Sequence, residues 1–173
     1  MINKNIFVVT GGTSGLGLAI AEKIYKNGGL VVVLGRNDNN IKKINKKYNY
    51  KKLIAFKCDI SVEENIQDIF KHIKKKYGFV YGLVNNAGIN PSRSGILDTS
   101  FLDWKKTIDT NLTGYFLCSK FAINHMKKLK RGSIVNISSV ASYGMKDRIS
   151  YSSSKAGIIG FTKSLALDHA DEG

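Results

Sequence analysis

The chain has 173 residues, of which 43% are hydrophobic and 23% charged, and it contains a single proline. This length suits one domain with a real core, and the scarcity of proline argues against linker-rich or disordered segments. No apolar run approaches the ~20 residues that a membrane-spanning helix needs, so we expect no membrane partner. The start, MINKNIFVVTGG, has too short an apolar stretch for a secretory leader, and we therefore expect a cytoplasmic protein.

The formal net charge of +14 raises the question of nucleic-acid binding. Lysines gather in three clusters, at 41–52, 71–78 and 126–132. Each cluster falls on the polar side or at the end of a predicted helix, where the helix dipole favours cations. Neither an aromatic-rich basic strand nor zinc-ligand spacing accompanies them. We expect no nucleic-acid partner, and a basic nucleic-acid-binding module remains the alternative from another functional class.

Cysteine and histidine are too sparse to build a metal centre. Cys58 and Cys118 do not form a C-x-x-C pair, and the three histidines are scattered singly. We interpret both cysteines as buried apolar residues and expect no metal site.

Short runs rich in Val, Ile and Leu alternate along the chain with amphipathic stretches. The apolar runs are nearly continuous, which is typical of parallel strands buried on both faces. They lie at 5–10, 30–35, 52–57, 81–85 and 133–138. Helical spacing of apolar residues predicts helices at 15–28, 38–49, 62–77, 100–128 and 151–168. This alternation predicts an α/β fold, a doubly wound parallel sheet with helices on both faces, in one domain over residues 1–173.

The first strand passes into the first helix through TGGTSGLG, residues 10–17. Gly11, Gly15 and Gly17 lack the Cβ atom that would block a tight turn or the close approach of a ligand. The following helix offers free N–H groups and a positive dipole end, which suit a pyrophosphate. The spacing G-x-x-x-G-x-G differs from the usual G-x-G-x-x-G, but its place between an apolar strand and a helix predicts dinucleotide binding.

The end of the second strand selects between the two nicotinamide dinucleotides. A carboxylate there would bond the ribose 2′-hydroxyl, whereas an arginine accommodates a 2′-phosphate. The sequence VVVLGRND places Gly35 and Arg36 at this point, and Asp38 follows after the strand should have ended. Arg36 therefore favours NADP(H) as the cofactor, with NAD(H) as the alternative.

The stretch YSSSK places Tyr151 and Lys155 one helical turn apart. Residues i and i+4 lie on the same face of a helix. A tyrosine normally keeps its proton up to a pKa of about 10, and a neighbouring cation favours the phenolate. The pair fits either an acid/base centre or an ordinary helix face.

Further motifs follow the other strands in order. CDIS (58–61), NNAG (85–88) and NISS (136–139) each close a strand, and Asn111 lies within DTNLTG in the long fourth helix. Groups at the carboxyl ends of parallel strands meet at the ligand crevice of such a sheet. Together with TGGTSGLG and YSSSK, this ordered set resembles the short-chain dehydrogenase/reductase family, in its single-domain Tyr-Lys form, over the whole chain.

The resemblance implies a Rossmann-like fold and an NAD(P)-dependent interconversion of a ketone and a secondary alcohol by hydride transfer. Tyr151 would be the general acid/base, Lys155 would tune it and bind the nicotinamide ribose, and Asn111 would anchor a water in a proton relay. A serine of NISS would orient the substrate oxygen. Counting back from Tyr151 gives Ser138, whereas anchoring on the strand gives Ser139. We assign Ser139, because a deletion is tolerated in the following loop and not within a strand.

The resemblance also implies where the cofactor lies. Asp59 would accept a hydrogen bond from the adenine amino group, and Asn86 and Gly88 would lie along the adenosine half of the cofactor. A helix cap at Asp59 and a tight turn at NNAG are the structural alternatives. The predicted cofactor-binding set is Gly11, Thr13, Ser14, Gly15, Leu16, Gly17, Arg36, Asp59, Ile60, Asn86, Ala87, Gly88, Tyr151 and Lys155.

The sequence stops soon after the Tyr-bearing helix, at SLALDHADEG. The family continues into a sixth strand with a Pro-Gly turn at the nicotinamide, a substrate-covering segment and a seventh strand. We therefore interpret the chain as a truncated member that lacks the last strands, and an inactive dinucleotide-binding remnant is an alternative to an enzyme. The expected partners are a small carbonyl or alcohol substrate and, in a full-length form, further copies in a dimer or tetramer.

Overall fold

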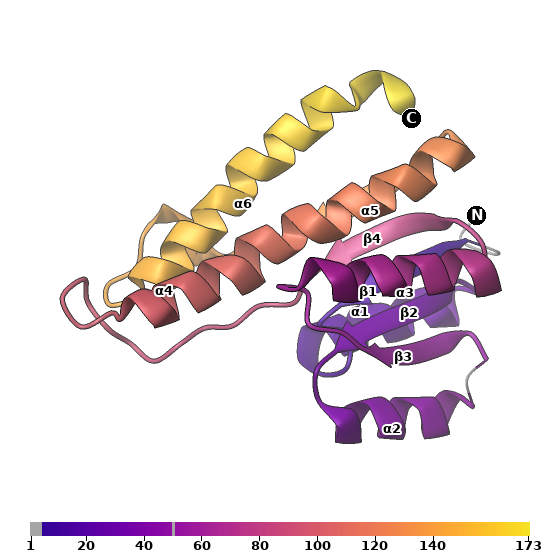
Figure 1. The fold of residues 1–173 in the computed structure, drawn as a ribbon, viewed down its shortest axis with the longest axis horizontal. Helices are drawn as coiled ribbons and strands as arrows, with labels where there is room; N and C mark the ends of the chain where they lie inside the picture. Colours follow the sequence, from indigo (N-terminus) through magenta and orange to yellow (C-terminus); the bar gives the residue numbers. More distant parts are fainter. Residues whose placement is uncertain (1–4, 50) are drawn as a thin grey trace.

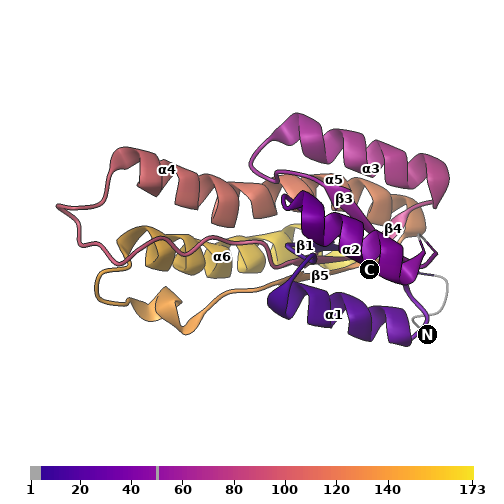
Figure 2. The same cartoon turned by 90° about the horizontal axis from the view of Figure 1, so that it is seen from below.

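The structure, a computed structural model, describes residues 5–49 and 51–173. Residues 1–4, which open the stretch interpreted as lacking a leader, and residue 50, within the first lysine cluster, lie outside the described residues. Five parallel strands form one sheet in the order β3-β2-β1-β4-β5. Figure 1 labels β1 to β4, and Figure 2 also labels β5. They are β1 (Ile6–Thr10), β2 (Leu30–Gly35), β3 (Leu53–Lys57), β4 (Val80–Asn85) and β5 (Ser133–Asn136). The predicted parallel α/β sheet is confirmed.

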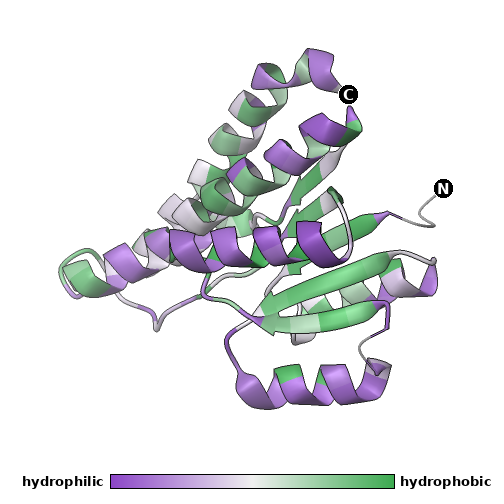
Figure 3. Ribbon diagram, turned by 45° about the vertical axis from the view of Figure 1, so that its right-hand side comes forward, coloured by the Kyte–Doolittle hydropathy of each residue, from purple (hydrophilic) through white to green (hydrophobic). Residues whose placement is uncertain are grey.

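The strands are apolar on both faces because both faces are covered. Along β1, Val8 packs in one hydrophobic cluster and Val9 in the cluster on the other side of the sheet. In β2, Val32 and Val33 divide in the same way. Figure 3 shows the strands as nearly unbroken hydrophobic ribbons, with hydrophilic residues concentrated on the outer helices.

Helices lie on both sides of the sheet. The cluster containing Val9 includes residues of α1 (Gly15–Lys26) and α2 (Asp38–Tyr48). The cluster containing Val8 includes residues of α3 (Glu63–Lys76), α5 (Gly114–Leu129) and α6 (Ile149–Asp168). Figure 2 shows α1 and α3 on opposite sides of the strands.

The long helix predicted at 100–128 is not a single α-helix. It consists of α4 (Phe101–Ile108), a π-helical turn at Asp109–Thr113 and α5. The backbone stays in the right-handed helical region at both junctions, so the helix widens there without breaking. Such π turns occur often at functional sites, and this one contains Asn111.

The last strand is shorter than its apolar run. β5 ends at Asn136, although the N–H of Ile137 still donates to the carbonyl of Asn85 at 2.9 Å. The two serines of NISS therefore lie beyond the strand. A 3-10 helix at Val140–Tyr143 follows, α6 begins at Ile149, and a final 3-10 turn occupies Ala170–Glu172.

The strand order fixes where a ligand can bind. The chain runs outward from β1 to β2 and β3, then crosses back to β4 on the other side of β1. The connections after β1 and β4 therefore diverge, which leaves a crevice at the carboxyl ends of these strands.

Among the described residues, none of the helices combines the length and the apolar character that a membrane-spanning segment needs.

Candidate active site

A cavity of about 380 Å³ lies at this crevice, above the ends of β1 to β4. Of the predicted cofactor-binding residues, eleven line it: Gly11, Thr13, Ser14, Leu16, Gly17, Arg36, Asp59, Ile60, Asn86, Ala87 and Gly88. Gly15 instead borders a neighbouring hollow between α1 and α2. At the other end the cavity reaches Ile89 and Thr110, next to Asn111.

Three glycines of the first turn are required for different structural reasons. A Cβ on Gly11, whose φ is +63°, would come within 2.8 Å of the Cα of Ala87, and one on Gly17 would lie 2.4 Å from Nδ2 of Asn86. Both are therefore needed for the turn to pack against NNAG. Gly15 has open space around it but a φ of +52°, so its glycine serves the backbone conformation.

Thr10, which the sequence reasoning did not single out, joins the first turn to the end of β4. Its Oγ1 accepts hydrogen bonds from the N–H groups of Asn86 and Ala87, each at 3.0 Å. In return, Nδ2 of Asn86 donates to the carbonyl of Thr10 at 3.0 Å. The side chain of Asn86 thus fixes the glycine turn. The sequence feature that could have identified Thr10 is its hydroxyl group at the end of the first strand, directly before the glycines.

The first turn of α1 faces the cavity without a competing charge. Ser14 is the N-cap residue, but its side chain makes no capping hydrogen bond, and the first turn of α1 carries no acidic residue. The free N–H groups and the positive end of the helix dipole are therefore open to an anion.

Arg36 and Asp59 meet at the far end of the cavity. Nη1 of Arg36 lies 3.7 Å from Oδ2 of Asp59. Oδ1 of Asp59 accepts from the N–H of Ser61 at 3.0 Å and from its hydroxyl at 2.7 Å. Burial by itself raises the pKa of Asp59, but the bonds from Ser61 and the charge of Arg36 outweigh it and keep the pKa below its ordinary value. Asp59 both caps the turn before α3 and offers Oδ2 to the cavity.

Tyr151 and Lys155 converge at the start of α6. Nζ of Lys155 lies 5.7 Å from the ring centroid of Tyr151 and donates to the carbonyl of Ile137 at 2.8 Å. Lys155 is only 4% exposed. Burial lowers the pKa of Lys155 to about 8, so its ammonium form still predominates near neutral pH.

A second tyrosine, Tyr115 in α5, shares this environment. Its hydroxyl donates to the same carbonyl of Ile137 at 3.3 Å, and Nζ of Lys155 lies 5.5 Å from its ring. Tyr115 is fully buried, and burial raises its pKa. It therefore cannot meet a substrate, whereas Tyr151 is only partly buried.

Asn111 connects the π turn to both neighbouring segments. Its Oδ1 accepts from the N–H of Ile89 at 2.8 Å, and its Nδ2 donates to the carbonyl of Ile89 at 2.9 Å. Nδ2 also donates to the hydroxyl of Ser154 at 3.1 Å, and Ser154 donates to the carbonyl of Tyr151 at 2.7 Å. The side-chain amide of Asn111 is therefore hydrogen-bonded to protein groups through both Oδ1 and Nδ2. Ser154 was not among the site residues predicted from the sequence.

Gly88 is where the cavity meets the Tyr151–Lys155 pair. A Cβ at this position would lie 3.3 Å from Oδ1 of Asn111 and 3.8 Å from Nζ of Lys155. The end of β4, the π turn and α6 thus converge within a few ångströms. The absence of a side chain at Gly88 keeps the passage between them open.

The two serines of NISS have different partners. The hydroxyl of Ser138 donates to the carbonyl of Lys155 at 2.9 Å, which turns it toward α6. Oγ of Ser139 accepts from the N–H of Ala141 at 3.2 Å and caps the short 3-10 helix. An accepting hydroxyl keeps its own proton to donate, so Ser139 retains a donor that Ser138 has already used.

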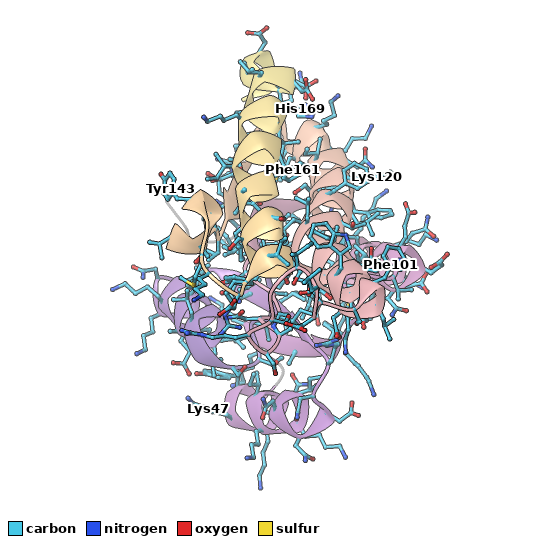
Figure 4. All side chains as sticks on the ribbon, turned by 90° about the vertical axis from the view of Figure 1, so that its left-hand side faces the viewer. Lys47, Phe101, Lys120, Tyr143, Phe161 and His169 are labelled. Carbon is cyan, nitrogen blue, oxygen red and sulfur yellow. The ribbon has the colours of Figure 1, made fainter. Side chains whose placement is uncertain are left out.

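The side of the site beyond these serines is open. Val140 is 77% exposed and Tyr143 is 91% exposed. Tyr143 lies at the outer edge of the molecule in Figure 4, beside the start of α6. The adenosine side is walled by the sheet and α1, whereas the side on which a substrate would approach lacks a cover among the described residues.

Known proteins resemble this chain over nearly its whole length. The profile of the short chain dehydrogenase family matches residues 5–173. The 3-oxoacyl-(acyl-carrier-protein) reductase FabG of Aquifex aeolicus is 38% identical, with 98% of this chain and 69% of the relative covered. The glucose 1-dehydrogenase 2 of Bacillus subtilis is also 38% identical, with 96% and 66% covered. The 3beta-hydroxysteroid dehydrogenase of Mediterraneibacter gnavus is 34% identical, with 99% and 63% covered.

The chain thus spans 63% to 69% of the length of these curated relatives. A crystal structure of NAD+-bound xylitol dehydrogenase matches with a TM-score of 0.94 at 27% identity, covering 99% of this chain and 67% of that one. On the family profile, these relatives and the fold, the chain belongs to the short-chain dehydrogenase/reductase family.

Proposed function

We propose that the protein is an NAD(P)-dependent oxidoreductase that interconverts a ketone and a secondary alcohol. The observation that supports this best is the convergence at Gly88 of the cavity at the carboxyl ends of the strands with Asn111 and Lys155. A dinucleotide with its pyrophosphate at the first turn of α1 would extend from Asp59 toward this point.

Tyr151 is the proposed general acid/base. When bound, the nicotinamide supplies the hydride for the carbonyl carbon or accepts it in the reverse direction. In reduction, the hydroxyl of Tyr151 donates its proton to the carbonyl oxygen, and in oxidation it takes that proton back. The ammonium of Lys155, 5.7 Å from the ring, stabilises the phenolate that remains. Ser139 donates a hydrogen bond to the same substrate oxygen.

NADP(H) is the proposed cofactor, with NAD(H) as the alternative. Arg36 is half-exposed at the cavity and contacts Asp59 through one nitrogen only. A guanidinium that is half-exposed at the cavity keeps N–H donors for a 2′-phosphate. Thr13 and Ser14 place hydroxyl-bearing side chains on the same cavity.

The substrate is proposed only as a class, a small carbonyl or alcohol compound. The relatives are named for a 3-oxoacyl-(acyl-carrier-protein), glucose, a hydroxysteroid and xylitol. These compounds have in common only a carbonyl or alcohol group. The exposure of Val140 and Tyr143 favours a second candidate, a dinucleotide-binding remnant without turnover. That candidate predicts tight binding of NADPH that no carbonyl substrate oxidises.

A charge at the N-cap of α1 tests the proposed function without disturbing the fold. Asp is as good an N-cap residue as Ser, and it complements the helix dipole, so Ser14→Asp should keep or raise the melting temperature. The same carboxylate would repel the pyrophosphate, so we expect affinity for NADPH to fall at least about tenfold, or about 1.4 kcal/mol. Titration with NADPH, followed by its fluorescence, measures the change.

Ser14→Asn is the matched neutral control. It should cap the helix equally well and bind NADPH nearly as the wild type does. Equal binding by the Asp and Asn variants, or a wild type that binds neither NADPH nor NADH at millimolar concentration, would refute the proposal.

A further inference from the structure

The side chain of Thr13 occupies the space that a side chain at position 35 would need. A Cβ built on Gly35 would lie 2.3 Å from Oγ1 of Thr13, 2.6 Å from its Cγ2 and 3.0 Å from its Cβ. Both residues line the cavity, at the end where Arg36 lies. Position 35 is also where an acidic side chain would meet the ribose 2′-hydroxyl of NAD(H).

Thr13 has little freedom to move aside. It is 8% exposed and belongs to a turn packed directly on the end of β2. The N–H of Gly12 donates to the carbonyl of Leu34 at 3.2 Å, and a Cβ on Gly12 would come within 2.7 Å of Val33. Rotation about χ1 of Thr13 moves Oγ1 and Cγ2 but leaves its Cβ in place, and a β-branched side chain has few rotamers to choose from.

We propose that Thr13 determines cofactor choice by keeping position 35 free of a side chain. This inference rests on the proposed function and adds a residue to it. With no carboxylate at position 35, Arg36 is the charged residue at the end of β2, and the 2′-phosphorylated cofactor is favoured. An acid at position 35 can confer preference for NAD(H) only when Thr13 is made smaller as well.

The steric contact is tested first, without ligand, by a thermal double-mutant cycle. Gly35→Ala should lower the melting temperature, because its methyl group collides with Thr13. Thr13→Ala, combined with Gly35→Ala, should recover at least half of that loss. Gly160→Ala is the matched control, because a Cβ there meets nothing within 4 Å and alanine favours the helix. If the changes in melting temperature caused by Gly35→Ala alone and by Thr13→Ala alone simply add in the double variant, Thr13 does not restrict position 35.

Binding tests the consequence for specificity. Calorimetric titration compares ADP-ribose with its 2′-phosphate, two probes that need only the adenosine side of the cavity. Relative to the wild type, Thr13→Ala with Gly35→Asp should reduce the preference for the 2′-phosphate at least tenfold, with ADP-ribose bound more tightly. Gly35→Asp alone should bind both probes more weakly than the double variant. The inference is overturned if the single variant shows the same preference and melting temperature as the double one.

The two experiments separate this inference from the proposed function. A wild type that binds neither probe refutes the proposed function and with it the specificity role, whatever the thermal cycle shows. A wild type that binds the 2′-phosphate, together with an additive thermal cycle, refutes the role of Thr13 alone.

Discussion

Lys155 illustrates how a single residue can oppose stability in order to serve a site. Its ammonium is buried beside Tyr115 and Tyr151, with the carbonyl of Ile137 as its hydrogen-bond acceptor. No acidic group contributes to its pKa, which burial lowers to about 8 from 10.5. A buried cation without a counter-ion is costly, and the proposed function accounts for its placement, because the cation would bind the nicotinamide ribose and stabilise the phenolate of Tyr151.

Replacing Lys155 with methionine should therefore stabilise the protein near neutral pH while weakening NADPH binding. The carbonyl of Ile137 keeps the hydroxyl of Tyr115 as a donor, so the substitution leaves no orphaned acceptor. Thermal melts measure the gain. Lys163→Met, on the exposed side of the same helix, is the control and should change little.

The pH dependence of this effect has a definite sign. Below pH 8 the folded wild type carries the buried charge and its penalty. Between about pH 8 and 10.5 the folded state loses this proton before the unfolded state does, so wild-type stability rises relative to the methionine variant. A difference in stability between the wild type and the Lys155→Met variant that stays constant from pH 7 to 10 would contradict this explanation.

Residue types at the strand ends were predictable from the sequence, but their partners were not. The order of motifs indicates which side chains reach the crevice. It does not indicate that Arg36 pairs with Asp59, or that Asn86 supports the glycine turn through Thr10. Such contacts join residues distant in the sequence, and only the packed fold determines them.

At the scale of elements, the π turn is the feature that sequence periodicity missed. Apolar spacing over 100–128 fits a helix on each side of the turn, and this spacing alone does not reveal the extra residue between the two parts. Structurally the turn matters, because it directs Asn111 at the backbone of Ile89 and at Ser154. The strands were easier to predict, because continuous apolar runs bounded by glycine or polar residues indicated all five strands of the described sheet.

Asn111→Ala should destabilise the protein by about 2 kcal/mol or more, because it removes three hydrogen bonds and leaves the N–H of Ile89 without its acceptor. Hydrogen exchange at Ile89 should accelerate as the segment after β4 loosens from the helix. Asn124→Ala, an exposed asparagine in α5, is the control and should be neutral or slightly stabilising. Unchanged exchange at Ile89 would show that the π turn does not hold this segment.

At the scale of the whole molecule, the sheet and the site are unequally covered. β5 is the last strand of the described sheet, and Val135 on it is 49% exposed. Figure 1 shows α5 and α6 running side by side past the sheet. The adenosine side of the cavity draws its walls from β1 to β4 and α1 and needs nothing further. The proposed catalytic side draws on the π turn at Asp109–Thr113, on α6 and on the segment after β5, in which Val140 is exposed. This asymmetry predicts that dinucleotide binding is more robust than turnover.

The most direct test is a crystal structure of the protein with NADPH. We expect the pyrophosphate at the first turn of α1, the 2′-phosphate bonded by Arg36, and the nicotinamide ribose within hydrogen-bond reach of Lys155, beside Tyr151. A dinucleotide bound elsewhere, or one whose nicotinamide end lies away from Lys155 and Tyr151, would contradict this expectation.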